Sequence, residues 1–235
     1  NFYCVIGSRP ADGSGQILLY RSKNGFEWEF VSILAKNQNR YGKMWECPDF
    51  FALKDKHVLI CSPQDMKARK YEFHNGHNSV YFLGDYDANR CRFSKEQPHT
   101  LDYGMDFYAP QTTELPDGRR IMIAWMKSWD ACVIPNSQDW QGMMTFPREL
   151  EIKELENYYQ NPCCYEHTEI EGETVLAGVE GRTIDLTVTL EDGENTIFSI
   201  KLAADSEYET SYTYNKETRL LEIDRTYCGV TTDVV

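Results

Sequence analysis

The sequence lacks the features that mark several large classes of protein. No apolar run in its 235 residues approaches the roughly 20 residues that a membrane-spanning helix needs. Cys-x-x-Cys pairs, Gly-x-Ser-x-Gly, Gly-x-Gly-x-x-Gly and phosphate-binding loops are absent, as is any Asn-x-Ser/Thr site. The five histidines form no pair with the spacing of a metal site or a catalytic triad. These absences exclude the common zinc, nucleotide and serine-hydrolase motifs.

Basic residues are scarce in the last third of the chain. Residues 1–150 carry 18 Lys and Arg against 18 Asp and Glu, whereas residues 151–235 carry 6 against 19, which accounts for the whole net charge of −13. All five tryptophans lie in the first part. This change of composition predicts two regions that meet near residue 150. Nucleic acids and anionic membranes bind basic surfaces, so neither is expected as a partner.

The eight cysteines are too sparse for a disulfide scaffold in a chain of this length. Several lie in apolar, strand-like segments, such as Cys61 in HVLICS. They are predicted to be reduced, buried thiols, which favours a cytoplasmic protein. The chain starts with NFYCVIG, which reads as the interior of a strand, and stops at TTDVV without a cap. We therefore expect both ends to be cut from a longer protein.

Short strand-like segments dominate the sequence, and no long amphipathic helix is indicated. They are rich in β-branched and aromatic residues and are separated by turn pairs such as Asn24-Gly25 and Asp117-Gly118. Residues 149–160 fit a short helix or a strand with a linker equally well. The expected strands are YCVIGS, QILLYRS, FEWEFVSIL, DFFAL, HVLICS, SVYFLGD, FYAPQTTEL, RRIMIAWM, TIDLTVTL, TIFSIKL, TSYTYN and LLEIDRT. The sequence predicts an all-β protein.

Two all-β architectures fit strands at this spacing. In the first part the strands come in sets of about four, which suits the blades of a propeller. In the second part apolar and polar residues alternate more cleanly, as in TIDLTVTL, which suits a two-sheet sandwich. The expected organisation is a β-propeller over residues 1–152, a linker over 153–164 and a β-sandwich over 165–235.

The first candidate motif is Trp45-Glu46-Cys47-Pro48-Asp49. A carboxyl group between a Trp and a Cys lies in a partly dry place, and desolvation raises the pKa of a carboxyl group, as a general acid requires. Pro48 fixes the loop, and Asp49 is placed to hold neighbouring donors. The competing interpretation is a Glu at the start of a strand beside a packing Trp, and the chemistry alone favours it.

The second candidate is the segment 102–111, in which Asp102, Asp106, Tyr103 and Tyr108 flank Gly104. Carboxylates accept hydrogen bonds from sugar hydroxyls, and aromatic faces cover the apolar face of the ring. A hairpin corner with polar decoration explains the same residues equally well.

Three further features have simpler explanations. Trp125, at the end of the strand RRIMIAWM, is either a sugar platform or part of the core. Arg148 and Glu149 most simply form a structural ion pair. The basic run Lys67, Arg69 and Lys70 is most simply a solvated loop, with contact to an anionic substrate group as a weaker alternative.

Taken together, these motifs resemble glycoside hydrolase family 32, which comprises invertases, sucrose-6-phosphate hydrolases and fructanases. The segments WECPDFF, SPQDM, YFLGDYD, LDYGMDFYAPQT, GRRIMIAWM and FPREL follow the order and spacing of that family. They cover most of residues 1–150, and the bacterial intracellular type is the most similar. The resemblance implies a five-bladed β-propeller followed by a β-sandwich. It also implies hydrolysis of terminal β-fructofuranosyl bonds of sucrose, sucrose 6-phosphate or short fructans, with a small saccharide as the partner and no metal or cofactor.

Roles carry over to matching positions of this sequence. The resemblance implies that Glu46 is the general acid/base and that Cys47 tunes its proton affinity. Asp106 is expected to bind fructosyl hydroxyls with Tyr108 close by, and Trp125 to line the sugar pocket. Asp49 and Arg148 are expected to be supporting residues, Asp49 among the substrate-binding ones. No oligomeric state is implied.

One departure from the family pattern concerns the nucleophile. The family uses an Asp in an Asn-Asp-Pro motif and a second Asp in an Arg-Asp-Pro motif, but this sequence contains no Asp-Pro dipeptide. We therefore expect a propeller without its first blade and a shortened sandwich. A retaining glycosidase needs two carboxyl groups about 5–5.5 Å apart, so the chain alone is predicted to be inactive and poorly stable. The alternatives are a non-catalytic carbohydrate-binding relative and, ranked lower, a propeller hydrolase of arabinose-type sugars.

Overall fold

A computed structural model describes residues 1–69, 72–104, 106–127, 129, 140, 142–152, 188 and 194–228. The chain divides into two compact units, one made chiefly of Asn1–Lys153 and the other within Glu154–Thr231. The described residues form strands and turns, with no helix among them, which confirms the all-β prediction. Within the same ranges, no helix is long and apolar enough to cross a membrane.

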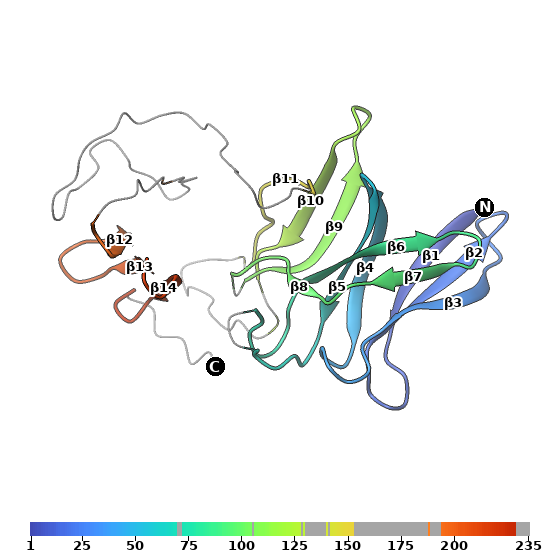
Figure 1. Cartoon of the computed structure of the whole chain (residues 1–235), viewed down its shortest axis with the longest axis horizontal. Coiled ribbons are helices and arrows are strands. Elements are labelled where there is room, and N and C mark those ends of the chain that lie inside the picture. Colours follow the sequence, from blue (N-terminus) through green and yellow to red (C-terminus); the bar gives the residue numbers. More distant parts are fainter. Residues whose placement is uncertain are drawn as a thin grey trace. The chain divides into compact units, whose positions relative to one another are not determined.

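The first sheet is a three-stranded antiparallel meander (Figure 1). Its second turn contains the predicted pair Asn24-Gly25, and Gly25 has a φ of 79°, which favours glycine. The side chain of Asn24 accepts hydrogen bonds from the amides of Phe26 and Glu27, so this turn closes on itself. The strands are β1 (Phe2–Ser8), β2 (Gln16–Ser22) and β3 (Glu29–Lys36).

The second sheet has five strands, in the order β4-β5-β6-β7 with β8 also paired to β6. The segment expected as DFFAL begins four residues earlier than predicted, so Glu46 lies inside a strand rather than before one. An irregularity between Glu46 and Asp49 lets the strand continue through Pro48. The strands are β4 (Trp45–Leu53), β5 (Lys56–Pro63), β6 (Val80–Asp87), β7 (Arg92–Lys95) and β8 (His99–Thr100).

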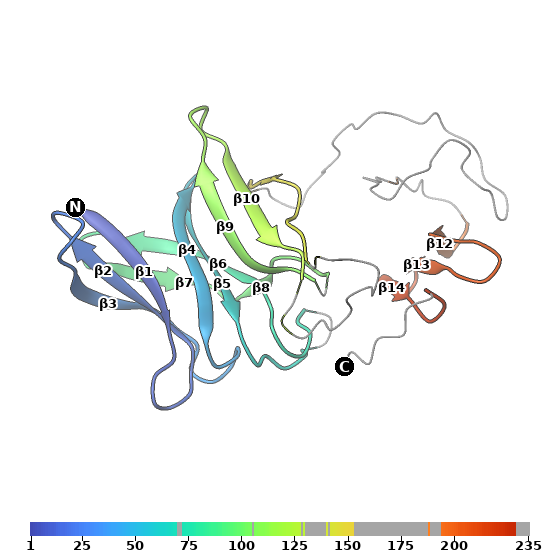
Figure 2. The same ribbon diagram turned by 180° about the vertical axis from the view of Figure 1, so that it is seen from behind.

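The third sheet has the order β11-β10-β9 and completes the first unit. In Figures 1 and 2, which show opposite sides, β9 and β10 lie on one side of β4, and β1 to β3 lie on the other. Of the ambiguous segment 149–160, Glu149 is in a short strand, and residues 153–160 lie outside the described ranges. The strands are β9 (Tyr108–Glu114), β10 (Arg120–Trp125) and β11 (Arg148–Glu149).

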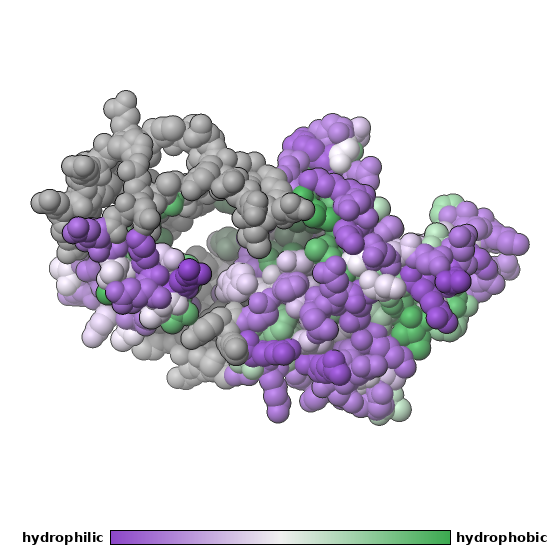
Figure 3. Space-filling view, in the orientation of Figure 1, coloured by the Kyte–Doolittle hydropathy of each residue, from purple (hydrophilic) through white to green (hydrophobic). Residues whose placement is uncertain are grey.

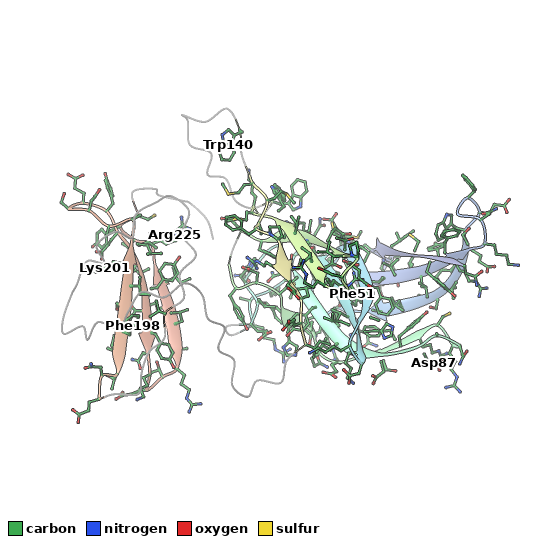
Figure 4. All side chains as sticks on the ribbon, turned by 90° about the horizontal axis from the view of Figure 1, so that it is seen from above. Phe51, Asp87, Trp140, Phe198, Lys201 and Arg225 are labelled. Carbon is green, nitrogen blue, oxygen red and sulfur yellow. The ribbon has the colours of Figure 1, made fainter. Side chains whose placement is uncertain are left out.

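The second unit contains one antiparallel sheet in its described part, in the order β12-β13-β14. Phe198 and Lys201, both on β12, are labelled in Figure 4, and Lys201 forms an ion pair with Glu209 at 3.1 Å. The expected strand TIDLTVTL lies almost wholly outside the described residues. The strands are β12 (Ile197–Leu202), β13 (Thr210–Asn215) and β14 (Leu220–Asp224).

Trp45 lies at the centre of the larger apolar cluster of the first unit. Its side chain is fully buried, and its Nε1 donates a hydrogen bond to the carbonyl of Tyr41 at 2.7 Å. The ring of Phe82, on β6, lies 5.2 Å from it. Two glycines make room for this residue, because a Cβ on Gly15 would collide with the indole and a Cβ on Gly7 would collide with the Trp45 carbonyl. Strand β4 is thus packed between the first sheet and the other strands of the second sheet.

An apolar surface covers part of the first sheet. Figure 3 shows green atoms over the region of β1 to β3, and the exposed apolar side chains there are Phe2, Ile6, Phe30 and Ile33. Strand β1 pairs only with β2 among the described strands, so it is an edge strand with an apolar face beside it.

We predict that Gly15→Ala and Gly7→Ala each destabilise the first unit by about 1–3 kcal/mol, because both overpack the Trp45 site. The two differ in the obstacle that the new methyl group meets. Replacing the indole in Trp45→Leu should relieve most of the Gly15→Ala penalty, since the clash there is with the side chain. It should relieve none of the Gly7→Ala penalty, where the obstacle is a backbone carbonyl. Urea unfolding of the singles and doubles measures both couplings; equal couplings would contradict this packing.

Candidate functional site

A β-bulge in β4 directs the first candidate motif. Glu46 pairs with Ser62 and Asp49 with Ile60, so Cys47 and Pro48 together oppose the single residue Cys61. Cys47 has a φ of 46°, a left-handed conformation that is costly for a residue with a side chain. Proline lacks an amide hydrogen, so its place in the bulge leaves no donor without a partner.

A hollow of about 380 Å³ lies over this bulge. It collects residues from β1, β4, β9 and β10 and from the segments that precede β4 and follow β10. The lining residues are Gly7, Met44, Glu46, Cys47, Tyr108, Ala109, Trp125 and Trp129. Four of the residues proposed from the sequence, Glu46, Cys47, Tyr108 and Trp125, therefore share one cavity.

Glu46 and Tyr108 contact each other directly. The Tyr108 hydroxyl donates a hydrogen bond to Glu46 Oε2 at 3.0 Å, and it also lies 3.3 Å from the carbonyl of Ser62. The Tyr108 side chain is only 2% exposed. Burial, together with the hydrogen bond to Glu46 and the charge of that carboxylate, raises the pKa of the Tyr108 hydroxyl above its ordinary value of 10.0. The phenol therefore remains a hydrogen-bond donor to the carboxylate at every physiological pH.

Ser62 is a buried residue for which no role was predicted beyond its place in the SPQDM segment. Its hydroxyl accepts a hydrogen bond from the Ala109 amide at 3.1 Å and lies 3.3 Å from the hydroxyl of Ser79. Ser79 in turn bonds the carbonyl of Phe107. These contacts tie the start of β9 to the end of β5, so they fix the place of Tyr108 in the hollow.

Two tryptophans form an aromatic wall of the hollow. The rings of Trp125 and Trp129 meet edge to face with centroids 5.6 Å apart. The backbone of Met126 donates to Met143, so the segment after Gly142 extends the edge of β10. Gly142 has a φ of 75° and lies against the Trp125 indole, where a side chain would not fit. Indole faces of this kind cover the apolar face of a sugar ring.

Cys47 lines the hollow as a free thiol. Burial, and then the charge of Glu46, raise the pKa of this thiol, which keeps it neutral beside the carboxylate. A neutral thiol contributes a polarisable, weakly polar wall rather than a second charge.

The second candidate motif separates in the structure. Tyr108 lines the hollow, but Asp106 and Tyr103 are exposed and line no part of it. Asp102 accepts a hydrogen bond from the Gly104 amide at 2.7 Å. The structure therefore does not bring Asp106 to Glu46, and its role in binding hydroxyls stays a prediction.

The prediction of an ion pair between Arg148 and Glu149 is wrong. Arg148 instead bonds Asp102 at 2.6 Å and lies over the ring of Phe107, while Glu149 faces Arg119 at 3.9 Å. Both residues are in β11, and successive side chains of a strand point to opposite faces. Arg148 thus anchors the loop before β9, a supporting contact away from the hollow.

Asp49 does not line the hollow, and neither do Lys67 and Arg69 of the basic run. Asp49 Oδ2 accepts two hydrogen bonds from Thr112 on β9, from the amide at 2.8 Å and from the hydroxyl at 2.6 Å. In the basic run, Arg69 bonds the Tyr41 hydroxyl at 3.3 Å, and Lys70 lies outside the described residues. Asp49 is therefore attached to a neighbouring strand rather than directed at a ligand.

The hollow offers one titratable carboxyl group, one phenol and two indoles. Among the described residues that line it, only Glu46 carries a carboxyl group. In the described ranges no cluster of three His, Cys, Asp or Glu is placed to hold a metal ion. The arrangement is able to move a proton at Glu46 and to cover an apolar ring face at the tryptophans.

Comparison with known proteins places these features in a family. The family model described as "Glycosyl hydrolases family 32 N-terminal domain" matches residues 1–162, and "Glycosyl hydrolases family 32 C terminal" matches residues 154–234. A curated sucrose-6-phosphate hydrolase from Staphylococcus xylosus is 33% identical over 97% of this chain and 48% of its own length. The chain thus spans about half of that relative.

Two solved structures extend the comparison. A family 32 β-fructofuranosidase from Bombyx mori is 37% identical, with a TM-score of 0.60 over 63% of this chain and 32% of that one. A variant of the same silkworm protein has been solved in complex with sucrose. An exo-inulinase from Aspergillus awamori, 18% identical, aligns over 91% of this chain and 48% of that one with a TM-score of 0.63, which shows a shared fold.

We predict a specific contribution of Tyr108 to alkaline unfolding. Its raised pKa means that the folded protein keeps the phenol proton above pH 10, whereas the unfolded chain releases it. The free energy of unfolding should then fall by about 1.4 kcal/mol per pH unit from this residue alone, between about pH 10 and 12. In Tyr108→Phe the free energy of unfolding should fall less steeply with pH, by that amount. Urea unfolding at several pH values across this range measures the two slopes. Tyr3→Phe, at an exposed tyrosine, is the control; equal slopes in the Tyr108→Phe protein and the parent would contradict the burial of a protonated phenol.

Proposed function

Since the chain belongs to glycosyl hydrolase family 32, we propose that it forms part of a retaining β-fructofuranosidase. The proposed reaction is hydrolysis of the terminal β-fructofuranosyl bond of sucrose, sucrose 6-phosphate or a short fructan. Support comes from the names of its relatives, a sucrose-6-phosphate hydrolase and a β-fructofuranosidase, and from the sucrose complex of the silkworm protein.

The observation that carries the proposal is the contact between Glu46 and Tyr108 inside an aromatic hollow. In the proposed mechanism the Glu46 carboxyl protonates the leaving glycosidic oxygen and later takes a proton from water. The Tyr108 hydroxyl holds one carboxyl oxygen, which leaves the other free to face the substrate. Trp125 and Trp129 cover the apolar face of a sugar ring.

We further propose that the 235-residue polypeptide does not turn over substrate by itself. Double displacement needs a second carboxyl group about 5–5.5 Å from the acid/base. In the part of the chain that the structure describes, Glu46 is the only lining residue with a carboxyl group. Asp49 is held by Thr112, and Asp106 is exposed outside the hollow. The same observation favours the second candidate function, a carbohydrate-binding relative that holds a sugar without hydrolysing it.

The proposed architecture follows the family. The three sheets of the first unit are taken as blades of a five-bladed propeller, with β1, β4 and β9 as inner strands around the hollow, and the second unit as a β-sandwich. Cys4, Cys47, Cys61 and Cys91 are free thiols, which supports a cytoplasmic location.

A chimera provides the test of this function. The 235-residue polypeptide is expected to release no fructose from sucrose or sucrose 6-phosphate. Joining it to the part of the Staphylococcus xylosus enzyme that lies outside the match should restore hydrolysis, because that part supplies the remaining carboxyl group. Fructose release, measured for both proteins and both substrates, decides between the phosphorylated and the free sugar.

Glu46→Gln is the decisive variant of the chimera. Loss of general acid/base catalysis should lower kcat by about 10²–10⁴-fold, while Glu29→Gln, at an exposed residue of the first sheet, should leave kcat unchanged. A chimera that binds sucrose but is inactive would favour the binding relative. Hydrolysis by the 235-residue polypeptide alone, abolished by Glu46→Gln, would show that the second carboxyl lies within this chain.

A further inference from the structure

The bulge around Glu46 has a counterpart on the neighbouring inner strand. On β9, Tyr108 pairs with Trp125 and Gln111 with Ile123, so Ala109 and Pro110 together oppose the single residue Ala124. Ala109 has a φ of 51°, close to the 46° of Cys47. Strands β4 and β9 therefore carry the same bulge, a residue in the left-handed conformation followed by proline. In each strand the site residue, Glu46 or Tyr108, comes immediately before it.

The two bulged strands run side by side without a shared hydrogen-bond ladder. Strands β4 and β9 belong to different sheets. What joins them is a set of three side-chain contacts, from Tyr108 to Glu46, from Gln111 Nε2 to the Cys47 carbonyl, and from Thr112 to Asp49. The partners are separated by 62, 64 and 63 residues along the chain, so the strands run in the same direction and in step.

The contact between Asp49 and Thr112 consists of two hydrogen bonds, whereas each of the other two contacts has one. A single carboxylate oxygen accepts both the amide and the hydroxyl of Thr112, and hydrogen bonds to an ionised acceptor are stronger than neutral ones. The Thr112 amide would otherwise be an unpaired donor on the edge of β9. Asp49 takes the place of a ladder partner at this edge.

Arg120 orients the hydroxyl of Thr112. Its Nη1 donates to Thr112 Oγ1 at 2.8 Å, so the hydroxyl proton is directed toward Asp49. The guanidinium lies 4.1 Å from the centroid of the Phe51 ring. Phe51, labelled in Figure 4, is on β4, the same strand as Asp49. The link between the two strands is therefore fixed from both sides.

We propose that Asp49 is a positioning residue. By binding the amide and hydroxyl of Thr112 it holds β9 in step with β4, and so sets the Tyr108 hydroxyl on the Glu46 carboxylate. The importance of that carboxylate for catalysis rests on the proposed function, but the positioning itself is a property of the folded chain. It is therefore testable without turnover.

The test is carbon-13 NMR of the 235-residue polypeptide labelled at the tyrosine Cζ, with Tyr108→Phe to assign the signal. Glu46→Ala defines the position of the Tyr108 signal when the contact is lost. Asp49→Leu should move the signal by more than half of the way to that position and should lower the pH at which Tyr108 ionises. Asp49→Asn, which keeps an oxygen for Thr112, should stay close to the parent. Asp85→Leu, at an exposed carboxylate paired with Lys56, should change nothing.

Urea unfolding of each variant separates positioning from stability. A folded Asp49→Leu protein that is less stable but keeps the parent Tyr108 signal would overturn the proposal, because Asp49 would then only join the sheets. So would an Asp49→Asn signal displaced as far as that of Asp49→Leu. If Asp49→Leu does not fold, Thr112→Val and Thr112→Ser decide instead. The Tyr108 signal should be displaced in Thr112→Val and should lie close to the parent position in Thr112→Ser. An undisplaced signal in Thr112→Val would refute the proposal.

Discussion

Burial of the Trp45 indole determines where the neighbouring carboxyl group points. Successive side chains of a strand face opposite sides, so a Trp45 held in the core directs Glu46 away from it and into the hollow. The apolar surface of one indole, at about 25 cal/mol per Å², stabilises this choice by several kcal/mol. Gly7 and Gly15 make the burial possible, because any side chain at either position would occupy the space of Trp45.

Apolar clusters span the sheets of the first unit, but β4 and β9 are aligned by polar contacts rather than by a continuous ladder. Between β4 and β9 each link is a side chain that reaches a backbone group or another side chain, and each contributes about 0.5–1.5 kcal/mol, or more where a charge takes part. Such links are directional. They therefore fix the register of the two sheets more precisely than apolar packing does. A group that transfers a proton needs such precise placement.

The residues proposed from the sequence fall into two groups for a physical reason. Glu46 and Cys47 lie near the start of β4, Tyr108 starts β9 and Trp125 ends β10, and the backbone brings these strand ends to one cavity. Asp102 and Arg148 bind each other, and Asp49 binds a strand of the next sheet. All of these residues belong to the family-like motifs, yet only the first group lines the hollow. A shared motif predicts which part of the fold a residue belongs to. Its burial and its contacts in the folded chain then determine whether its side chain lines the hollow.

Alternation, turn pairs and the order of the motifs determined much of this protein from sequence alone. They predicted an all-β chain, most of its strands, and the family to which it belongs, because strand periodicity and Asn-Gly or Asp-Gly turns are local properties. The short strands β7, β8 and β11 were missed, since two to four residues carry too little pattern. The bulges, the partners of Arg148 and the contact between Asp49 and Thr112 were decided only in three dimensions. The two contacts depend on which segments become neighbours across 46 and 63 residues of chain, and the bulges depend on a register shift between paired strands. No local sequence pattern records either.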